Sequence, residues 1–209
     1  DLETTGTDPL TAQVVTAAVV HLGGDDALGA ASRNWLVDPG VEIPPQATAV
    51  HGITTEHARE NGERLADALT AIADALQQVW ADGLPIVVFN AAYDLTLLNA
   101  SLAAIGATPL VARPGWERAL IIDPLVIDRA VDRYRRGKRT LQDMTVHYGV
   151  VAEGAHSADG DAVATCRLAR AIARRYPEVG AADVPALLSQ QAVWAGEWAM
   201  RFQAYLRSQ

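Results

Sequence analysis

Apolar positions along the chain recur with two different periods, which predict strands in some segments and helices in others. Residues 13–22 and 30–37 alternate apolar with polar side chains and are rich in β-branched residues, with Gly-Gly-Asp-Asp between them. This pattern predicts an antiparallel hairpin. Residues 62–82 carry apolar side chains three or four positions apart, as one face of a helix does. We therefore expect a hairpin followed by a helix.

Strands and helices alternate along the next part of the chain. Residues 86–89 and 119–122 are short apolar runs, typical of strands buried on both faces, and each precedes a segment with helical spacing. Further helices are expected at 140–148, 157–176 and 184–206. Residues 1–3 read as the end of another strand. Together these elements predict an α/β fold, with a mixed sheet flanked by helices.

The length and net charge of the chain limit the classes of protein to which it can belong. The chain has 209 residues, which suits one well-buried domain spanning 1–209. No apolar run reaches the roughly 20 residues of a membrane helix, and no signal region opens the sequence, so we expect a cytoplasmic location and no membrane partner. The formal net charge of -8 argues against a protein that coats long stretches of nucleic acid. It does not exclude an enzyme that binds only a strand end.

Three acidic side chains stand where strands end. Asp1 and Glu3 are two apart in a predicted strand, so both point to the same face and suit a hard cation. The alternative is a solvated strand edge. Asp94 follows the apolar run 86–89, at the edge where open α/β sheets bind ligands. Its alternative role is to complement the dipole of the helix that begins there.

His156 and Asp161 lie five residues apart at the start of a predicted helix. Ser157 is a plausible N-cap, which places His156 in the preceding loop and Asp161 beside the apolar stripe of the helix. A helix anchors a metal ligand well, whereas a loop suits a base that must move. The alternative for His156 is a loop histidine without a role. Asp159 is a competing acid that should point away from Asp161.

The order of these residues resembles a known family. Asp-Leu-Glu-Thr-Thr-Gly at 1–6, Asn-Ala-Ala-Tyr-Asp at 90–94 and His-Ser-Ala-Asp-Gly-Asp at 156–161 resemble the three motifs of the DEDDh, or DnaQ-like, 3′→5′ exonucleases. The likeness is to exonuclease domains of the DNA polymerase III epsilon type, and His-Gly-Ile-Thr at 51–54 adds to it. It covers about residues 1–176, which leaves 177–209 as a helical tail.

The resemblance implies a ribonuclease H-like fold with a five-stranded mixed sheet. It implies two divalent ions, Mg or Mn, held by Asp1, Glu3, Asp94 and Asp161, with His156 as the general base. The expected reaction releases nucleoside 5′-monophosphates from the 3′ end of nucleic acid, with single-stranded DNA preferred for proofreading or repair. The alternatives are an RNA-trimming enzyme and, less favoured, a catalytically silent module that binds nucleic acid or a partner.

Two features depart from the family pattern. Phe89 precedes Asn90 where a histidine is frequent, and Tyr93 stands where phenylalanine is common, although neither change removes a ligand. Asp1 opens the printed sequence, so most of the strand that should hold it is missing. We expect upstream residues to complete that strand.

Substrate contacts are expected from two regions. The segment 133–139 is the one dense basic cluster of the sequence, so we predict that Arg136, Lys138 and Arg139 meet phosphates; the alternative is a solvated loop. Candidates for the terminal nucleotide are Leu2, Thr4, Thr5, His51 and Asn90, with a structural role as the alternative for His51.

The helical tail carries an aromatic stripe made of Trp194, Trp198, Phe202 and Tyr205. Packing of this stripe on its own domain is the favoured expectation. A homodimer or a polymerase contact through this helix is the alternative.

Overall fold

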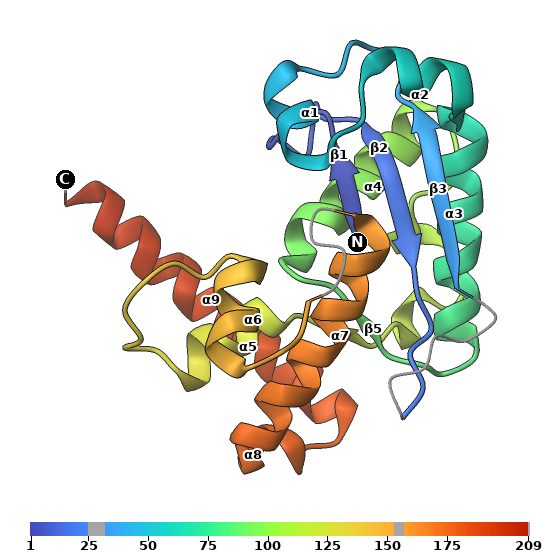
Figure 1. Ribbon diagram of the computed structural model, residues 1–209. Coiled ribbons are helices and arrows are strands. Elements are labelled where there is room, and N and C mark those ends of the chain that lie inside the picture. Colours follow the sequence, from blue (N-terminus) through green and yellow to red (C-terminus); the bar gives the residue numbers. More distant parts are fainter. Residues whose placement is uncertain (25–31, 153–156, 209) are drawn as a thin grey trace.

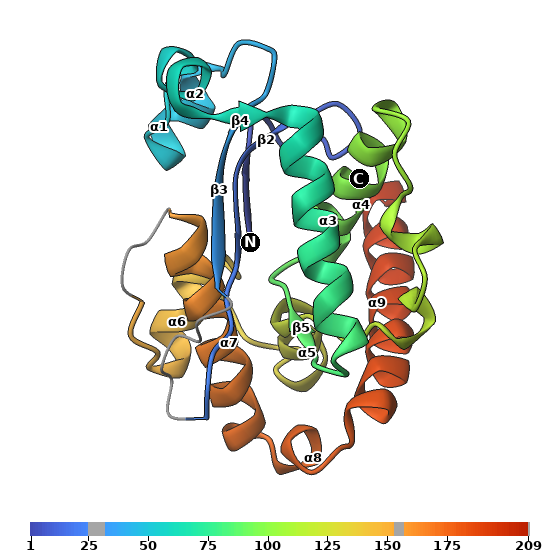
Figure 2. The same ribbon diagram turned by 90° about the vertical axis from the view of Figure 1, so that its right-hand side faces the viewer.

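The computed structural model describes residues 1–24, 32–152 and 157–208. Its larger sheet has the strand order β1-β2-β3-β4 (Figures 1 and 2). These strands are β1 (Leu2–Thr4), β2 (Val14–Val19), β3 (Arg33–Asp38) and β4 (Glu63–Arg64). The first three pair antiparallel and β4 pairs parallel to β3. The β2–β3 pair confirms the predicted hairpin; residues 25–31 of its connection lie outside the described residues.

A smaller sheet pairs β5 (Ile86–Val87) with β6 (Ile121–Ile122) in parallel. The prediction of one five-stranded sheet is therefore wrong, because the described residues form six strands in two sheets. β1 has only three residues and pairs with β2. In the described part of the chain, no strand pairing joins β1 to β5, so the two sheets stay separate. The α/β class and the mixed sheet flanked by helices are confirmed.

Helices account for most of the other described residues. Those that the apolar spacing predicted are α3 (Leu65–Ala81), α4 (Ala91–Ala104), α5 (Pro124–Val131), α6 (Leu141–Tyr148), α7 (Ala158–Arg175) and α9 (Val184–Arg207). The sequence pattern missed α1 (Pro45–His51), α2 (Thr55–Asn61), α8 (Pro177–Gly180) and the 3-10 turns Leu110–Ala112 and Trp116–Arg118. α1 buries no residue fully, so it shows no apolar stripe from which to predict it.

The larger sheet lies between α3 and α7, which Figure 2 shows on its opposite sides. Adjacent residues of β2 face the two helices in turn, one packing toward α3 and the next toward α7, since side chains of a strand alternate between faces. Ala17 belongs to the apolar cluster that includes α3, whereas Ala18 packs against Ala158 and Ala162 of α7. Three alanines allow α7 to approach the strand closely. This packing places the start of α7 beside the end of the sheet that holds β1.

The helix α9 packs against α5 and then projects from the body of the molecule (Figure 1). Gln191 is buried, and its amide donates to the carbonyl of Ile121 (3.0 Å) while its oxygen accepts from the N–H of Asp123 (2.7 Å). Trp194 packs into the adjoining apolar cluster, as predicted. Phe202 is exposed, as is Tyr205 further on, so the expectation that the stripe packs on its own domain is wrong there. This end of α9 extends past the rest of the domain, which leaves Phe202 and Tyr205 exposed.

Among the described residues, no helix is both long and apolar enough to span a lipid bilayer.

Candidate active site

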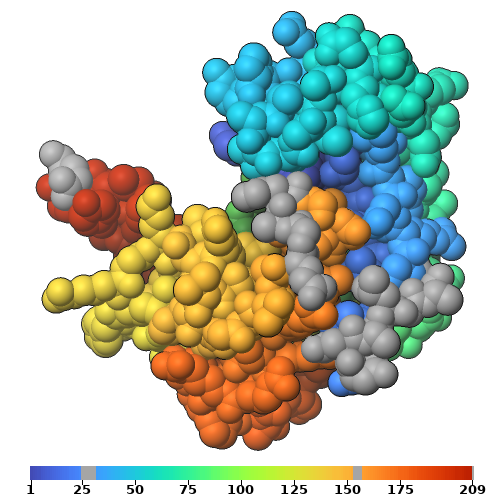
Figure 3. All heavy atoms as spheres, viewed as in Figure 1, coloured from blue at the N-terminus to red at the C-terminus, as the bar shows by residue number. Residues whose placement is uncertain are grey.

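Four predicted acidic residues line one cavity of about 600 Å³. Asp1 and Glu3 come from the start of the chain and β1, Asp94 from the first turn of α4, and Asp161 from the first turn of α7. Figure 3 shows the surface hollowed between the light-blue region of α1 and the yellow segment that leads into α6. The fold therefore brings together side chains that are far apart in the sequence.

Three of these acids form a tight cluster. Carboxylate oxygens of Asp1, Glu3 and Asp161 all lie within 4.8 Å of one another. Asp1 and Glu3 share a strand face because they are two residues apart. Asp161 meets them because α7 packs on β2 through Ala18 and Ala162. Asp94 lines the same cavity but lies outside this group.

The position of Asp94 depends on how α4 begins. Asn90, the N-cap residue, has φ of 60° and is the only residue other than glycine with positive φ among those described. The Asp123 carboxylate accepts hydrogen bonds from the backbone N–H groups of Asn90 (3.1 Å), Ala91 (2.9 Å) and Leu125 (2.9 Å). One buried carboxylate thus caps two helices, α4 and α5. It holds the turn that directs Asp94, only 8% exposed, into the cavity.

Replacing Asp123 by alanine should lower the free energy of unfolding by about 1–3 kcal/mol, because buried N–H donors lose their acceptor. The exonuclease rate expected of the site should also fall, since the start of α4 loosens. Asp123→Asn keeps one acceptor oxygen and should lose about half as much stability. Urea unfolding followed by circular dichroism measures this difference. Equal stability of the alanine variant and the parent protein would contradict the capping role.

Burial and charge crowding shift the pKa of two of these carboxyl groups. Burial raises the pKa of Glu3 to about 7, and repulsion from Asp161 and Asp94 adds to the shift. Burial likewise raises the pKa of Asp94 to about 6. A divalent cation would relieve the repulsion and prefers oxygen ligands. The residues present therefore fit a metal site.

The predicted base, His156, lies outside the described residues. Its neighbour Ser157 is the N-cap of α7, as predicted, and its hydroxyl accepts from the N–H of Gly160 (3.4 Å). Asp159 does not line the acidic cavity but a neighbouring one. Of the acids in this turn, the cavity thus includes Asp161.

Comparison with known proteins decides the family. The family model described as "RNase_T: Exonuclease" matches residues 1–169. The chain belongs to this exonuclease family. This membership confirms the predicted DEDDh 3′→5′ exonuclease superfamily. The matched range includes the residues that form the cavity. The core of the chain is an exonuclease domain.

Curated relatives and solved structures agree with this family. A "DNA polymerase III subunit epsilon-like protein" of Rhodobacter capsulatus is 30% identical over 87% of the chain and 24% of its own length. A "DNA polymerase III PolC-type" protein of Streptococcus suis is 29% identical over 80% of the chain and 10% of its own length. Exonuclease I of E. coli in complex with a dT13 oligonucleotide has a TM-score of 0.69 at 20% identity, over 86% of the chain and 41% of that structure. The chain spans a quarter or less of these curated relatives.

The exonuclease domain places the predicted contacts for a terminal nucleotide in two groups. Leu2 and Asn90 line the acidic cavity, whereas Thr4, Thr5 and His51 do not. The Thr4 and Tyr93 hydroxyls both donate to the carbonyl of Gly6, and the Thr5 hydroxyl accepts from the N–H of Gln13 (2.9 Å). In His51, Nδ1 accepts from the N–H of Ile53 (3.1 Å), and burial lowers the pKa of the ring. The side chains of Thr4, Thr5 and His51 therefore stabilise local backbone turns.

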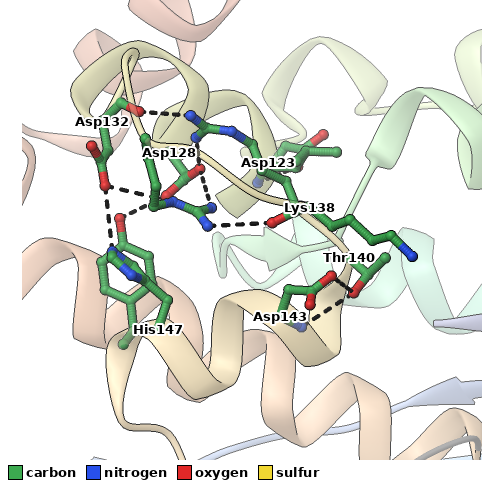
Figure 4. Close-up of polar contacts among 11 residues, drawn as sticks. Asp123, Asp128, Asp132, Lys138, Thr140, Asp143 and His147 are labelled. Atoms are coloured by element: carbon green, nitrogen blue, oxygen red, sulfur yellow. Dashed lines mark hydrogen bonds and ion pairs between the residues drawn. The ribbon is translucent and has the colours of Figure 1, made fainter.

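The basic segment 133–139 folds back on a buried acid, as Figure 4 shows. Asp128 is 0% exposed and accepts hydrogen bonds from Arg135 (3.0 Å), Arg139 and the hydroxyl of Tyr148 (2.8 Å). The prediction that Arg139 is a phosphate contact therefore needs correction. Its guanidinium lies at the cavity wall but is already paired with Asp128, because a buried carboxylate requires a partner.

Two other predicted phosphate contacts, Arg136 and Lys138, are exposed and do not line the cavity. The Lys138 ammonium points away from the network around Asp128 (Figure 4). These two side chains stay candidates for contact with substrate outside the cavity.

Sequence reasoning missed Arg129, which lines the cavity from α5. The residue four positions earlier, Leu125, is buried and lines the same cavity. Residues four apart share a helix face, so an apolar residue followed by arginine at this spacing was the available signal. It was too common a pattern to single out Arg129.

Proposed function

We propose that this chain is a metal-dependent 3′→5′ exonuclease that removes nucleoside 5′-monophosphates from the 3′ end of single-stranded DNA. The observation that carries the proposal is the cluster of Asp1, Glu3 and Asp161 in a cavity that Asp94 also lines. The structures of E. coli exonuclease I with dT13 and dA16 oligonucleotides support DNA as the substrate.

Each acid has a place in this mechanism. Asp1, Glu3, Asp94 and Asp161 would hold two divalent cations, Mg²⁺ or Mn²⁺, whose charge stabilises an in-line displacement at phosphorus. By holding the cations, the carboxylates would determine where the anionic 3′-terminal phosphodiester binds. His156 would accept a proton from the attacking water, a task that suits a side chain with a pKa near neutrality. Cleavage then releases a mononucleotide and leaves a new 3′-hydroxyl.

Matched single-stranded DNA and RNA oligonucleotides test this proposal directly. With Mg²⁺ or Mn²⁺ we expect stepwise loss of 3′-terminal mononucleotides, resolved by gel electrophoresis, and faster loss from DNA. Because the reaction needs the metal, EDTA should abolish it. Internal cutting, or activity that survives EDTA, would refute the mechanism. Faster hydrolysis of RNA would instead favour the RNA-trimming alternative, since discrimination depends on the 2′-hydroxyl.

The biological setting is inferred from the relatives. Their names refer to DNA polymerase III, which supports a proofreading or repair role and a cytoplasmic location for this chain. We propose that residues 1–209 form one domain, with 1–176 as its core. The exposed apolar side of α9 is a candidate contact for a second copy or for a polymerase.

A further inference from the structure

Two arginines, Arg129 and Arg139, line the acidic cavity, and they differ in how their donors are used. Arg139 donates to the Asp128 carboxylate and to the carbonyl of Asp132 (2.7 Å). Across the described ranges, Arg129 makes no hydrogen bond and no ion pair, and its guanidinium lies over an aromatic ring. A guanidinium has five N–H donors. Those of Arg129 are therefore available to a ligand in the cavity.

The contact partner of Arg129 is Trp198 on α9. The guanidinium carbon lies 4.0 Å from the centroid of the Trp198 ring, and Trp198 in turn stacks on Phe202 with 5.1 Å between centroids and 11° between planes. A guanidinium that lies over an aromatic ring can still use its edge N–H donors, which suits bidentate binding of phosphate. Upstream in the same helix, Gln191 anchors α9 to β6. Trp198 is 39% exposed, so its contacts with Arg129 and Phe202 are what hold the ring in place.

The charges around Arg129 favour the binding of an anion. Burial lowers the pKa of Arg129, and the positive charge of Arg139 adds to this effect. Asp123 and Asp128 oppose the shift. A bound anion would relieve the repulsion between the two arginines.

We propose that Arg129, held in place by Trp198, binds an internucleotide phosphate of the substrate strand. The inference rests on the proposed function, because it takes the substrate to be single-stranded nucleic acid. Arg129 binds the strand directly, and Trp198 is a positioning residue. The helical tail, which continues beyond the residues matched by the exonuclease family, thereby takes part in substrate binding.

Binding of a 5′-labelled oligothymidylate of about ten nucleotides, followed by fluorescence anisotropy, tests the phosphate contact. Arg129→Gln should weaken binding roughly 10- to 100-fold, the loss expected of charged hydrogen bonds. It should also lower the slope of log Kd against log salt concentration by about 0.7, the value for one phosphate contact on a single strand. In hydrolysis assays the variant should raise KM and leave kcat nearly unchanged.

Three further variants separate charge, stacking and surface effects. Arg118→Gln removes an arginine that does not line the cavity and should bind as the parent protein does. Trp198→Ala should weaken binding several-fold, and Trp198→Phe should restore most of it, because phenylalanine also stacks on a guanidinium. Melting temperatures of all variants are measured in parallel. Loss of binding in Trp198→Phe equal to that in Trp198→Ala would contradict stacking as the means of positioning.

Neutral methylphosphonate linkages, placed one at a time along the oligothymidylate, locate the contact. One linkage should weaken binding to the parent protein yet leave Arg129→Gln unaffected, since the two changes remove the same interaction. Unchanged Kd and salt slope in Arg129→Gln would overturn the inference, as would failure of the parent protein to bind the oligonucleotide. A parent protein that binds but does not hydrolyse refutes the proposed function alone, because the Arg129 contact is still measured by binding.

Discussion

Replacing Glu3 by glutamine is expected to reduce the exonuclease rate by more than about 100-fold without destabilising the metal-free protein. Loss of a residue that only orients a metal ligand costs about 10- to 100-fold, so loss of a ligand should cost more. Glutamine keeps the shape of the side chain and removes one charge from a cluster whose oxygens lie within 4.8 Å of one another. Relief of this repulsion should leave the melting temperature in EDTA unchanged or raised.

The decisive measurement pairs kinetics with thermal unfolding of Glu3→Gln. Added Mn²⁺ should raise the melting temperature of the parent protein, because a ligand that binds only the folded state stabilises it. The variant should show a smaller rise. Glu117→Gln, at an exposed surface position, is the matched control. It should match the parent protein in exonuclease rate, in melting temperature in EDTA and in the rise of melting temperature with Mn²⁺. A variant that melts earlier in EDTA and keeps its response to Mn²⁺ would show that Glu3 is structural.

Asp128→Ala should produce the largest loss of stability in this chain. The carboxylate is fully buried and accepts from Arg135, Arg139 and Tyr148. Removing one partner of a buried ion pair leaves an unpaired charge and costs about 3–5 kcal/mol. For a chain of this size we expect a melting temperature lower by roughly 6–20 °C. Differential scanning calorimetry measures the change.

A surface ion pair provides the control for Asp128. Asp67 lies 3.8 Å from Arg64, and both side chains are exposed, so Asp67→Asn should leave the melting temperature almost unchanged. The segment 133–139 should also become more susceptible to trypsin in Asp128→Ala, because two of its arginines lose their shared partner. A melting temperature like that of Asp67→Asn would contradict a stabilising role for the network.

The resemblance to the exonuclease motifs named the acidic residues, and local rules account for part of their placement. Asp1 and Glu3 share a face through strand geometry, and Ser157 fixes the start of the helix that carries Asp161. The phosphate contacts were less predictable. Composition shows that 133–139 is basic, but it does not show that Arg139 pairs with Asp128, a residue eleven positions away.

The sequence by itself determined the α/β class, the long helices and the order of the acidic motifs, because apolar periodicity and residue spacing are local properties. Tertiary structure decided how three acids meet, since that depends on small side chains that let α7 approach β2. It also decided that β5 and β6 pair apart from the larger sheet, and that Arg129 lies over Trp198. Such contacts join residues far apart in the chain, so no local pattern records them.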